Sequence, residues 1–388
     1  MSQSSPSLAY PRELTIAVWG ACLLPGLLIL LGVDLGTHGV DSPSAKGLAD
    51  VPGQLHRQLA GSFMHTVLEW SAVGAAVVTG VGTLVHYLVR RNPVITVIGL
   101  SLLAAGLMDG YHVLVANRLV ASHSGDPDFI PFTGFISRIF CAVAFILGSW
   151  LLVTRGGRGR ETRAQIVATA AVIMMAAVSL SIAFASTTPF MPVTVFPDAV
   201  VPRPYELIPL ALFLLAGAFS LRMLNNYHPS IFTQAVLVSI VPHAMTQLYM
   251  GLGSTEPFDG WYNAAHVVKV VAYLVPVSGL LVDYVRMHRE EVETLSGLRE
   301  TERALQRSRA MYRTMVRNLP NSIVLLFDRE MRSLLAEGAA LQWLGLTPGD
   351  FEGEVLTDVL GDDILPTVGP AFHKALDGET SGFIYQGE

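Results

Sequence analysis

Pairs of ionisable side chains recur at helical spacing inside long apolar segments. The three pairs are His65 with Glu69, Asp109 with His112, and His266 with Lys269. Residues three or four positions apart lie on one face of an α-helix, so the members of each pair point the same way. Imidazole nitrogens and carboxylate oxygens are the usual protein ligands of first-row transition metals. The spacing therefore predicts a metal site built from the histidines and acids of these pairs: His65, Glu69, Asp109, His112 and His266.

Two further ionisable side chains lie alone in apolar segments. These are Arg138 and His243, and Gln247 follows His243 by four residues. An ionisable group within a bilayer costs several kcal/mol, faces the interior of a helix bundle and is a functional candidate by default. We therefore predict that Arg138, His243 and Lys269 belong to the same buried binding site as the metal-type ligands.

The segments that position these side chains are long enough to cross a membrane. Of the 388 residues, 51% are hydrophobic and only 14% are charged, whereas a soluble protein is about a quarter charged. A membrane-spanning helix needs roughly 20 apolar residues. Eight runs satisfy this length: 13–33, 61–89, 94–117, 131–153, 164–186, 206–224, 231–252 and 263–285. The sequence predicts a mainly α fold, with an eight-helix polytopic membrane domain over residues 13–285.

Arginine residues mark the same end of every second span. Arg90 and Arg91 follow the second span, four arginines follow the fourth, Arg222 ends the sixth, and two more follow the eighth. Loops rich in Lys and Arg stay in the cytoplasm. Both termini, including a tail over residues 1–12, are then expected to be cytoplasmic. Counted along the spans, nearly all the polar groups fall in the outer half of the bilayer, with His243 closer to the middle, and they are expected to form one site.

Several occupants of this site are compatible with the residue types. Histidines with carboxylates suit zinc, copper or iron, and two histidines from different helices suit a haem. Alternatively, Glu69 and Asp109 are neutralised by Arg138 and Lys269 in an ion-pair network that locks the helices. A polar pocket for a small ligand is the remaining alternative. The two cysteines, Cys22 and Cys141, offer no zinc or disulfide pattern.

A charged segment over residues 286–316 follows the last span. Leu298, Leu305 and Tyr312 repeat at seven-residue spacing, with Glu and Arg on the other faces. Such a repeat is typical of a coiled-coil seam. Thr294, Thr301 and Ser308 fall at the companion positions and would weaken the seam. We interpret the segment as a signalling helix that pairs two copies of the chain in a homodimer, with a solvated linker helix as the alternative.

The remaining residues, 317–388, predict an α+β domain. Ser322–Phe327 and Met331–Leu335 have the composition of strands, a helix-like run follows, and GFIYQ after residue 381 is typical of a strand start. The order resembles the PAS fold through Leu319-Pro320, Asp328, Leu344-Gly345 and residues 375–378. Glu337 and Gly338 replace the asparagine usual in that family. The last two strands are missing, so we expect a truncated PAS domain with an output domain beyond residue 388.

The membrane part resembles the membrane-associated sensor domains called MASE, most closely the third type. The resemblance is carried by FMHTVLEW (63–70), LLAAGLMDGYHVL (102–114), FISRIF (135–140), NNYHP (225–229) and the segment 265–285. It implies a sensor in the bacterial inner membrane that feeds a PAS domain and then a histidine kinase or diguanylate cyclase module, as in two-component systems. The partners implied are membrane lipids and a downstream output domain or response regulator. The resemblance supplies no ligand.

Three classes of function fit the polar spans to different degrees. A signal-transducing receptor explains the buried site, the connector and the PAS-like domain together. A membrane-embedded metal-dependent hydrolase, with Glu69 or Asp109 as general base toward a zinc-bound water, is the alternative. A transporter is disfavoured because no internal repeat is evident. A net charge of −6 gives no indication of nucleic-acid binding.

Overall fold

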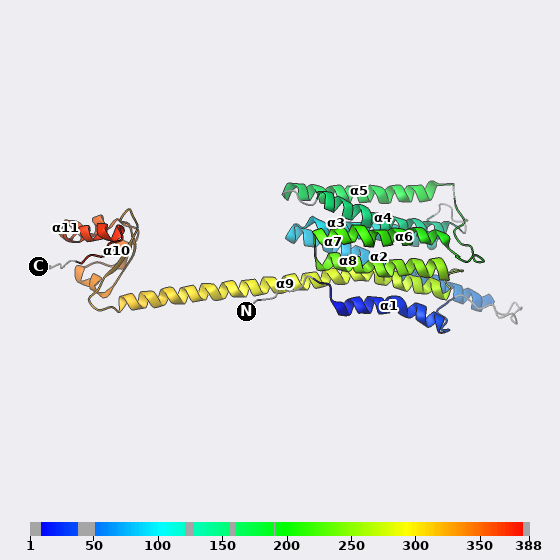
Figure 1. The fold of residues 1–388 in the computed structure, drawn as a ribbon, viewed down its shortest axis with the longest axis horizontal. Helices are drawn as coiled ribbons and strands as arrows, with labels where there is room; N and C mark the ends of the chain where they lie inside the picture. The colour runs from blue at the N-terminus through cyan, green and yellow to red at the C-terminus, as the bar shows by residue number, and fades with distance from the viewer. Residues whose placement is uncertain (1–8, 38–50, 121–127, 156–159, 190, 383–388) are drawn as a thin grey trace. The chain divides into compact units, whose positions relative to one another are not determined.

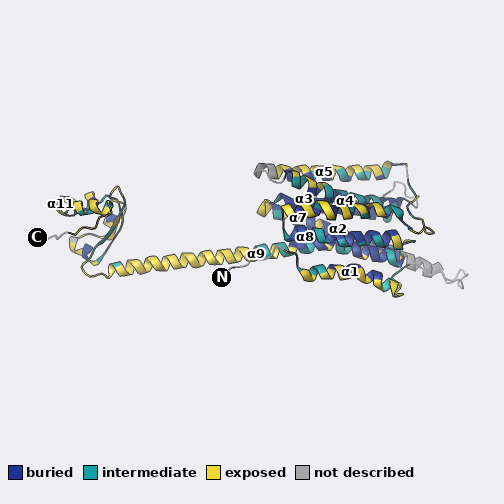
Figure 2. Cartoon of the chain, viewed as in Figure 1, coloured by how far each residue is buried: buried dark blue, intermediate teal, exposed yellow. Residues whose placement is uncertain are grey.

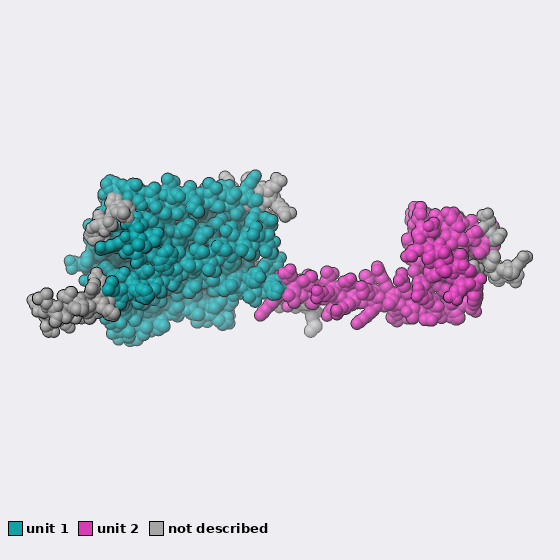
Figure 3. All heavy atoms as spheres, turned by 180° about the vertical axis from the view of Figure 1, so that it is seen from behind, with its two compact units in different colours: residues 1–288 teal, residues 289–388 magenta. Residues whose placement is uncertain are grey.

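The protein divides into two compact units, residues 1–288 and 289–388 (Figure 3). The computed structural model describes residues 9–37, 51–120, 128–155, 160–189 and 191–382. The boundary between the units falls within one helix, α9, which runs from Gly260 to Arg317 and contains Pro276.

The first unit is a bundle of long apolar helices (Figure 1). Its first five helices are α1 Arg12–Leu30, α2 Val51–Arg90, α3 Pro93–Ala116, α4 Phe129–Arg155 and α5 Arg160–Thr187. The sixth span is composite: η2 Pro204–Glu206, α6 Leu207–Leu215, the π-helical turn η3 Ala216–Leu221, and α7 Arg222–Tyr227. Then come α8 Ile231–Leu248, the π-helical turn η4 Tyr249–Gly253, and α9. Within the described residues, eight helices are long and apolar enough to cross a membrane, which confirms the predicted mainly α, polytopic fold.

Short polar sequences explain where several helices begin. Asn92 accepts a hydrogen bond from the backbone N–H of Val94, with Pro93 in the first turn, so α3 starts immediately after α2 ends. Ser230 and Thr233 form a reciprocal capping box at the start of α8. Asp259 precedes α9 and accepts from the backbone N–H of Tyr262 at 2.6 Å. The caps at Asn92 and Asp259 thus fix the starts of α3 and α9, which carry two of the three polar pairs.

Burial is uneven across the bundle. Almost every residue of α3 is buried, whereas α1 and α5 lie at the edges of the bundle and expose many apolar side chains (Figure 2). Ile16, Leu30 and Leu180 are each at least 70% exposed. A surface this apolar is unfavourable in water and suits contact with lipid chains. The exposure pattern agrees with a multi-pass membrane protein.

Small residues allow α2 and α3 to pack closely. A Cβ at Gly106 would meet the Cβ of Ala76, and one at Gly80 would meet Leu103 at 2.7 Å. Helices in membranes commonly associate through such small residues, because dispersion contacts and not the hydrophobic effect hold them together. The close approach of α2 and α3 brings His65 and Glu69 toward Asp109 and His112.

The second unit contains the end of α9 and a small α+β core. Strands β1 Val324–Phe327 and β2 Ser333–Glu337 pair antiparallel, followed by η5 Ala339–Leu344, α10 Pro348–Phe351 and α11 Leu356–Leu376. Leu341, Phe351 and Leu356 form its core. The second strand begins two residues later than predicted. The expected strand near GFIYQ lies mostly outside the described residues, and the PAS assignment and domain limits stay predictions.

We predict that Gly106→Ala destabilises the bundle by about 1–3 kcal/mol, because the added methyl group forces α2 and α3 apart. The measurement is the thermal unfolding midpoint of the purified protein in detergent. Gly74→Ala is the matched control, since a Cβ at Gly74 has nothing within 4 Å. Equal midpoints for the two variants would contradict the packing argument.

Candidate functional site

Lys269 on α9 connects the two carboxylates of the predicted pairs. Its Nζ lies 3.0 and 2.8 Å from the two carboxylate oxygens of Glu69 on α2, and 2.8 Å from Oδ1 of Asp109 on α3. All three side chains are buried. Removing charges from water is costly, so such a group is tolerable only with close partners of opposite sign. Lys269 therefore ties three spans together.

Asp109 has two further donors. Tyr273 donates its O–H to Oδ2 at 2.6 Å, and Ser137 on α4 donates to Oδ1. Sequence reasoning missed both residues. Tyr273 follows Lys269 by four positions, so helical spacing was the available signal for it. Ser137 only adjoins Arg138, which is not such a signal. With Lys269, these donors satisfy both oxygens of Asp109.

The three histidines of the predicted pairs converge on Glu69. His266 places Nε2 3.3 Å from Glu69 Oε1, and His65 places Nε2 3.9 Å from the same atom. The imidazole ring of His65 lies 4.7 Å from that of His266 and 5.8 Å from that of His112, between centroids. One ligand atom each from His65, Glu69 and His112 lies within 4.8 Å of the others. This spacing is close to that required around a single ion.

Hydrogen bonds fix which imidazole nitrogens carry protons. His112 Nδ1 lies 2.9 Å from Oγ1 of Thr133, whose hydroxyl donates to the carbonyl of Ile130, so Nδ1 is the donor. His266 Nδ1 lies 2.7 Å from the carbonyl of Tyr262 and must also donate. In the neutral rings, both Nε2 atoms then hold lone pairs, as in metal-ligating histidines. The lone pair of His266 would face Glu69 Oε1 at 3.3 Å, which is favourable only with a cation or a proton between the two atoms. His65 Nε2 is buried without a hydrogen-bond partner.

The charges of the cluster do not balance. Glu69 and Asp109 contribute two negative charges, and Lys269 contributes one positive charge. Arg138, which the sequence assigned to the same network, instead forms an ion pair with Glu206 in η2. Glu206 was missed, although it is the first residue of the predicted span 206–224. A cation or a proton near the histidines would neutralise the remaining charge.

His243 lies on another side of the cluster. Its ring stacks on Phe213 at 4.5 Å between centroids and packs edge-on against Tyr273 at 5.6 Å. His243, Asp109 and Lys269 line a chamber of about 10 Å³. The structure therefore brings six of the eight predicted residues into one cluster, with Arg138 and His243 at its border. Their binding roles stay predictions.

A cavity of about 680 Å³ opens beside the histidines. His65, His112 and His266 line it together with Arg138 and Glu206. A further lining residue is Arg203, which precedes the sixth span and donates to the carbonyl of Ser254 at 3.1 Å. Burial lowers the pKa of the Arg203 guanidinium, and nearby Glu206 opposes that effect. The cavity gives a small solute room to approach the buried cluster.

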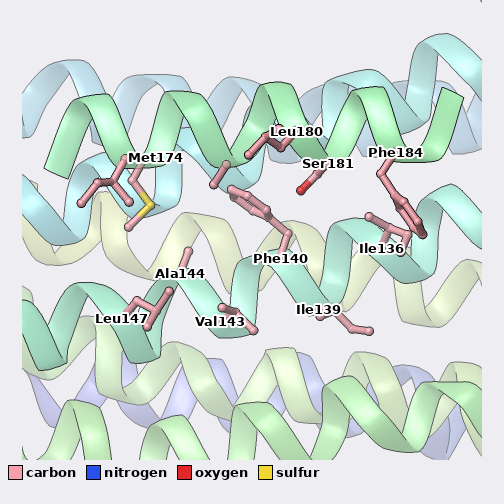
Figure 4. A pocket seen from close by; sticks show the side chains of 12 residues that line it. Ile136, Ile139, Phe140, Val143, Ala144, Leu147, Met174, Leu180, Ser181 and Phe184 are labelled. Carbon is pink, nitrogen blue, oxygen red and sulfur yellow. The ribbon is translucent and has the colours of Figure 1, made fainter. Parts of the chain in front are cut away.

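A second cavity, between α4 and α5, has a different character (Figure 4). It measures about 440 Å³. Among the described residues that line it, only Ser181 is polar, and the others are apolar side chains such as Phe140, Leu180 and Phe184. A pocket without charged groups in an apolar helix pair suits hydrocarbon. It is separate from the polar cluster.

Comparison with known proteins gives one match. Residues 61–287 match the family model MASE3, described as a membrane-associated sensor domain. That range covers more than half of the 388 residues and includes all six clustered side chains. No curated protein and no solved structure matches the chain.

We predict that Lys269→Met lowers the unfolding free energy by about 3–5 kcal/mol, because it leaves Glu69 and Asp109 buried without their shared cation. The measurement is thermal unfolding in detergent with a chelator present. A triple variant that also carries Glu69→Gln and Asp109→Asn should recover much of the loss. If Lys269→Met alone is as stable as the unmodified protein, the ion-pair cluster does not hold the bundle together.

Proposed function

The chain belongs to the MASE3 family of membrane-associated sensor domains, and on that premise we propose that it senses a first-row transition metal ion. The observation that supports this is the position of three imidazoles around the Glu69 carboxylate. The Nε2 atoms of His65 and His266 lie 3.9 and 3.3 Å from its Oε1, and a ring nitrogen of His112 lies within 4.8 Å of ligand atoms of His65 and Glu69. Two of these imidazoles have their proton held on the other nitrogen. A divalent ion there would also neutralise the excess negative charge.

His65, Glu69 and His112 are the proposed primary ligands, and His266 is the proposed fourth. Three histidines and a carboxylate suit zinc, copper or iron. Asp109 already accepts three hydrogen bonds, so we assign it a positioning role for Lys269. A haem is less well matched, because the His65 ring lies only 4.7 Å from the ring of His266 and 5.8 Å from that of His112, too close for a porphyrin to lie between them.

The cavity leading to this site would open on the extracytoplasmic side. Arg90 and Arg222 lie at the opposite ends of their spans from the cavity-lining residues Leu59 and Tyr205. Because arginine-rich ends stay in the cytoplasm, both termini would be cytoplasmic. A bacterial inner membrane is the proposed location.

Lys269 and His266 suggest how an ion would affect α9. An ion on Glu69 competes with Lys269 for the same carboxylate, so it weakens one of the contacts that hold α9 against α2. A ligand shifts a conformational equilibrium only through different affinities for the two states. The metal-bound state would therefore favour a different packing position of α9 against α2 and α3.

The connector part of α9 provides a route from the membrane domain to an output module. In the single chain, Leu298, Leu305 and Tyr312 are each more than 50% exposed. A second copy of the chain would cover this seam as a coiled coil. We propose a homodimer in which α9 passes the change to a PAS domain and to a histidine kinase or diguanylate cyclase module.

The metal proposal predicts that protein purified in detergent binds about one zinc, copper or iron ion per chain. His65→Ala and His112→Ala should lose most of this metal, and Thr133→Val should weaken its affinity about 10–100-fold by freeing the His112 ring. Metal content by mass spectrometry and a visible spectrum are the measurements. A Soret band would instead indicate haem.

His86→Ala is the control, because His86 lies near the other end of α2, 3.9 Å from Asp283. It should retain the metal of the unmodified protein. Unchanged metal content in both His65→Ala and His112→Ala would rule out the proposed ligands.

The relay proposal predicts that Leu305→Cys forms an intermolecular disulfide in membranes, because the seam brings the two copies together. Cross-linking yield should change when zinc is added and should not respond to zinc in the His65→Ala background. Arg307→Cys is the matched control, because residue 307 lies off the predicted seam and should give a lower yield of the intermolecular disulfide. Equal, zinc-independent yields at both positions would contradict a paired signalling helix.

A further inference from the structure

Residues that line the 680 Å³ cavity carry polar atoms that the metal proposal does not use. Within the described residues, nine buried side-chain atoms lack a hydrogen-bond partner, and four of these belong to residues that line this cavity. They are His65 Nε2, Arg138 Nε, Thr194 Oγ1 and Glu206 Oε2. Leaving a buried polar atom unsatisfied is unfavourable. Three of these unsatisfied atoms remain once His65 is assigned to the metal. The atoms themselves are covered, but their side chains border the cavity, so side-chain rotation would bring them to a solute.

The three remaining atoms differ in what they can bind. Arg138 Nε can only donate, a Glu206 carboxylate oxygen can only accept, and the Thr194 hydroxyl can do both. Each of the three residues is less than 10% exposed. Because Arg138 and Glu206 form an ion pair, the donor and the acceptor lie close together. A matching solute carries an acceptor and a donor side by side.

The cationic groups indicate the charge of that acceptor. Arg203 lines the same cavity and forms no ion pair with a carboxylate within the part of the chain described. Its Nε is used by the Ser254 carbonyl, while its planar guanidinium offers further donors. Guanidinium groups bind carboxylates through paired hydrogen bonds. The acceptor that best suits Arg138 and Arg203 is therefore a carboxylate.

We propose that this cavity binds a small organic acid with a hydrogen-bond donor beside its carboxylate, namely an α-amino or α-hydroxy acid. The carboxylate faces Arg138 and Arg203, and the neighbouring N–H or O–H faces Glu206 and Thr194. The volume lies within the range of about 300–1,000 Å³ usual for small-molecule sites. This inference goes beyond the proposed metal sensing and requires no metal.

The test uses the full chain in detergent, freed of metal by a chelator. Its thermal unfolding midpoint is measured with the L-amino acids, lactate and glycolate, each at millimolar concentration. At least one of these compounds should raise the midpoint by about 2–4 °C, because a ligand that binds only the folded state stabilises it. Propionate, which has the carboxylate but lacks the donor, should give no shift.

Two variants connect the shift to the cavity. Thr194→Val keeps the side-chain shape and should weaken binding about tenfold, through loss of one hydrogen bond. The double variant Arg138→Gln with Glu206→Gln removes both charges together, so no unpaired charge is left buried, and it should abolish the shift. Arg222→Gln, on α7 away from the cavity, should bind as the unmodified protein does.

Three outcomes would overturn the proposal: no compound raises the midpoint, propionate raises it as much as the best of these compounds, or the shift persists in both cavity variants. Because the experiment is done without metal, its failure leaves the metal proposal intact. Conversely, loss of the metal site in the earlier experiment would not remove a midpoint shift measured here.

Discussion

The bundle depends on one electrostatic constraint, the burial of two carboxylates and one ammonium group among apolar helices. Glu69, Asp109 and Lys269 come from α2, α3 and α9, and none of them is tolerable there without the others. Their attraction is directional, whereas contacts between apolar helices in lipid are not. The ion-pair cluster can therefore select one arrangement of these helices from the many that apolar packing alone would permit.

The same cluster that specifies the packing also provides chemical selectivity. Lys269, Ser137 and Tyr273 donate hydrogen bonds to both carboxylate oxygens of Asp109. The excess negative charge of the cluster therefore remains near the Glu69 carboxylate, which the imidazoles surround. A position with this combination favours a cation. Asp109 thus has a structural role and Glu69 a binding role. The difference arises because the hydroxyl donors Ser137 and Tyr273 lie beside Asp109.

The spans and the polar pairs were predictable from sequence because each leaves a strong signal. Long apolar runs predict helices in a bilayer, and spacings of three or four residues place Glu69 beside His65 and Lys269 beside His266. Partners between helices were not predictable in this way. Arg138 forms its ion pair with Glu206, and the ring of His243 stacks on that of Phe213. Both contacts depend on how the helices are rotated and on the composite sixth span, which the sequence pattern does not reveal. A neutral residue such as Ser137 carries no charge that distinguishes it in an apolar helix, and Tyr273 could be found only through its four-residue spacing from Lys269.

Pro276 has a consequence for how α9 can move. It lies seven residues after Lys269, on the side toward the connector. A proline in a helix lacks the N–H that would bond to the carbonyl four residues earlier, and it crowds that carbonyl. The helix consequently bends more easily at Pro276, because bending there breaks fewer hydrogen bonds than elsewhere in α9. If Lys269 is displaced, the part of α9 beyond residue 276 would change its direction by bending at Pro276 more readily than it would shift along the helix axis.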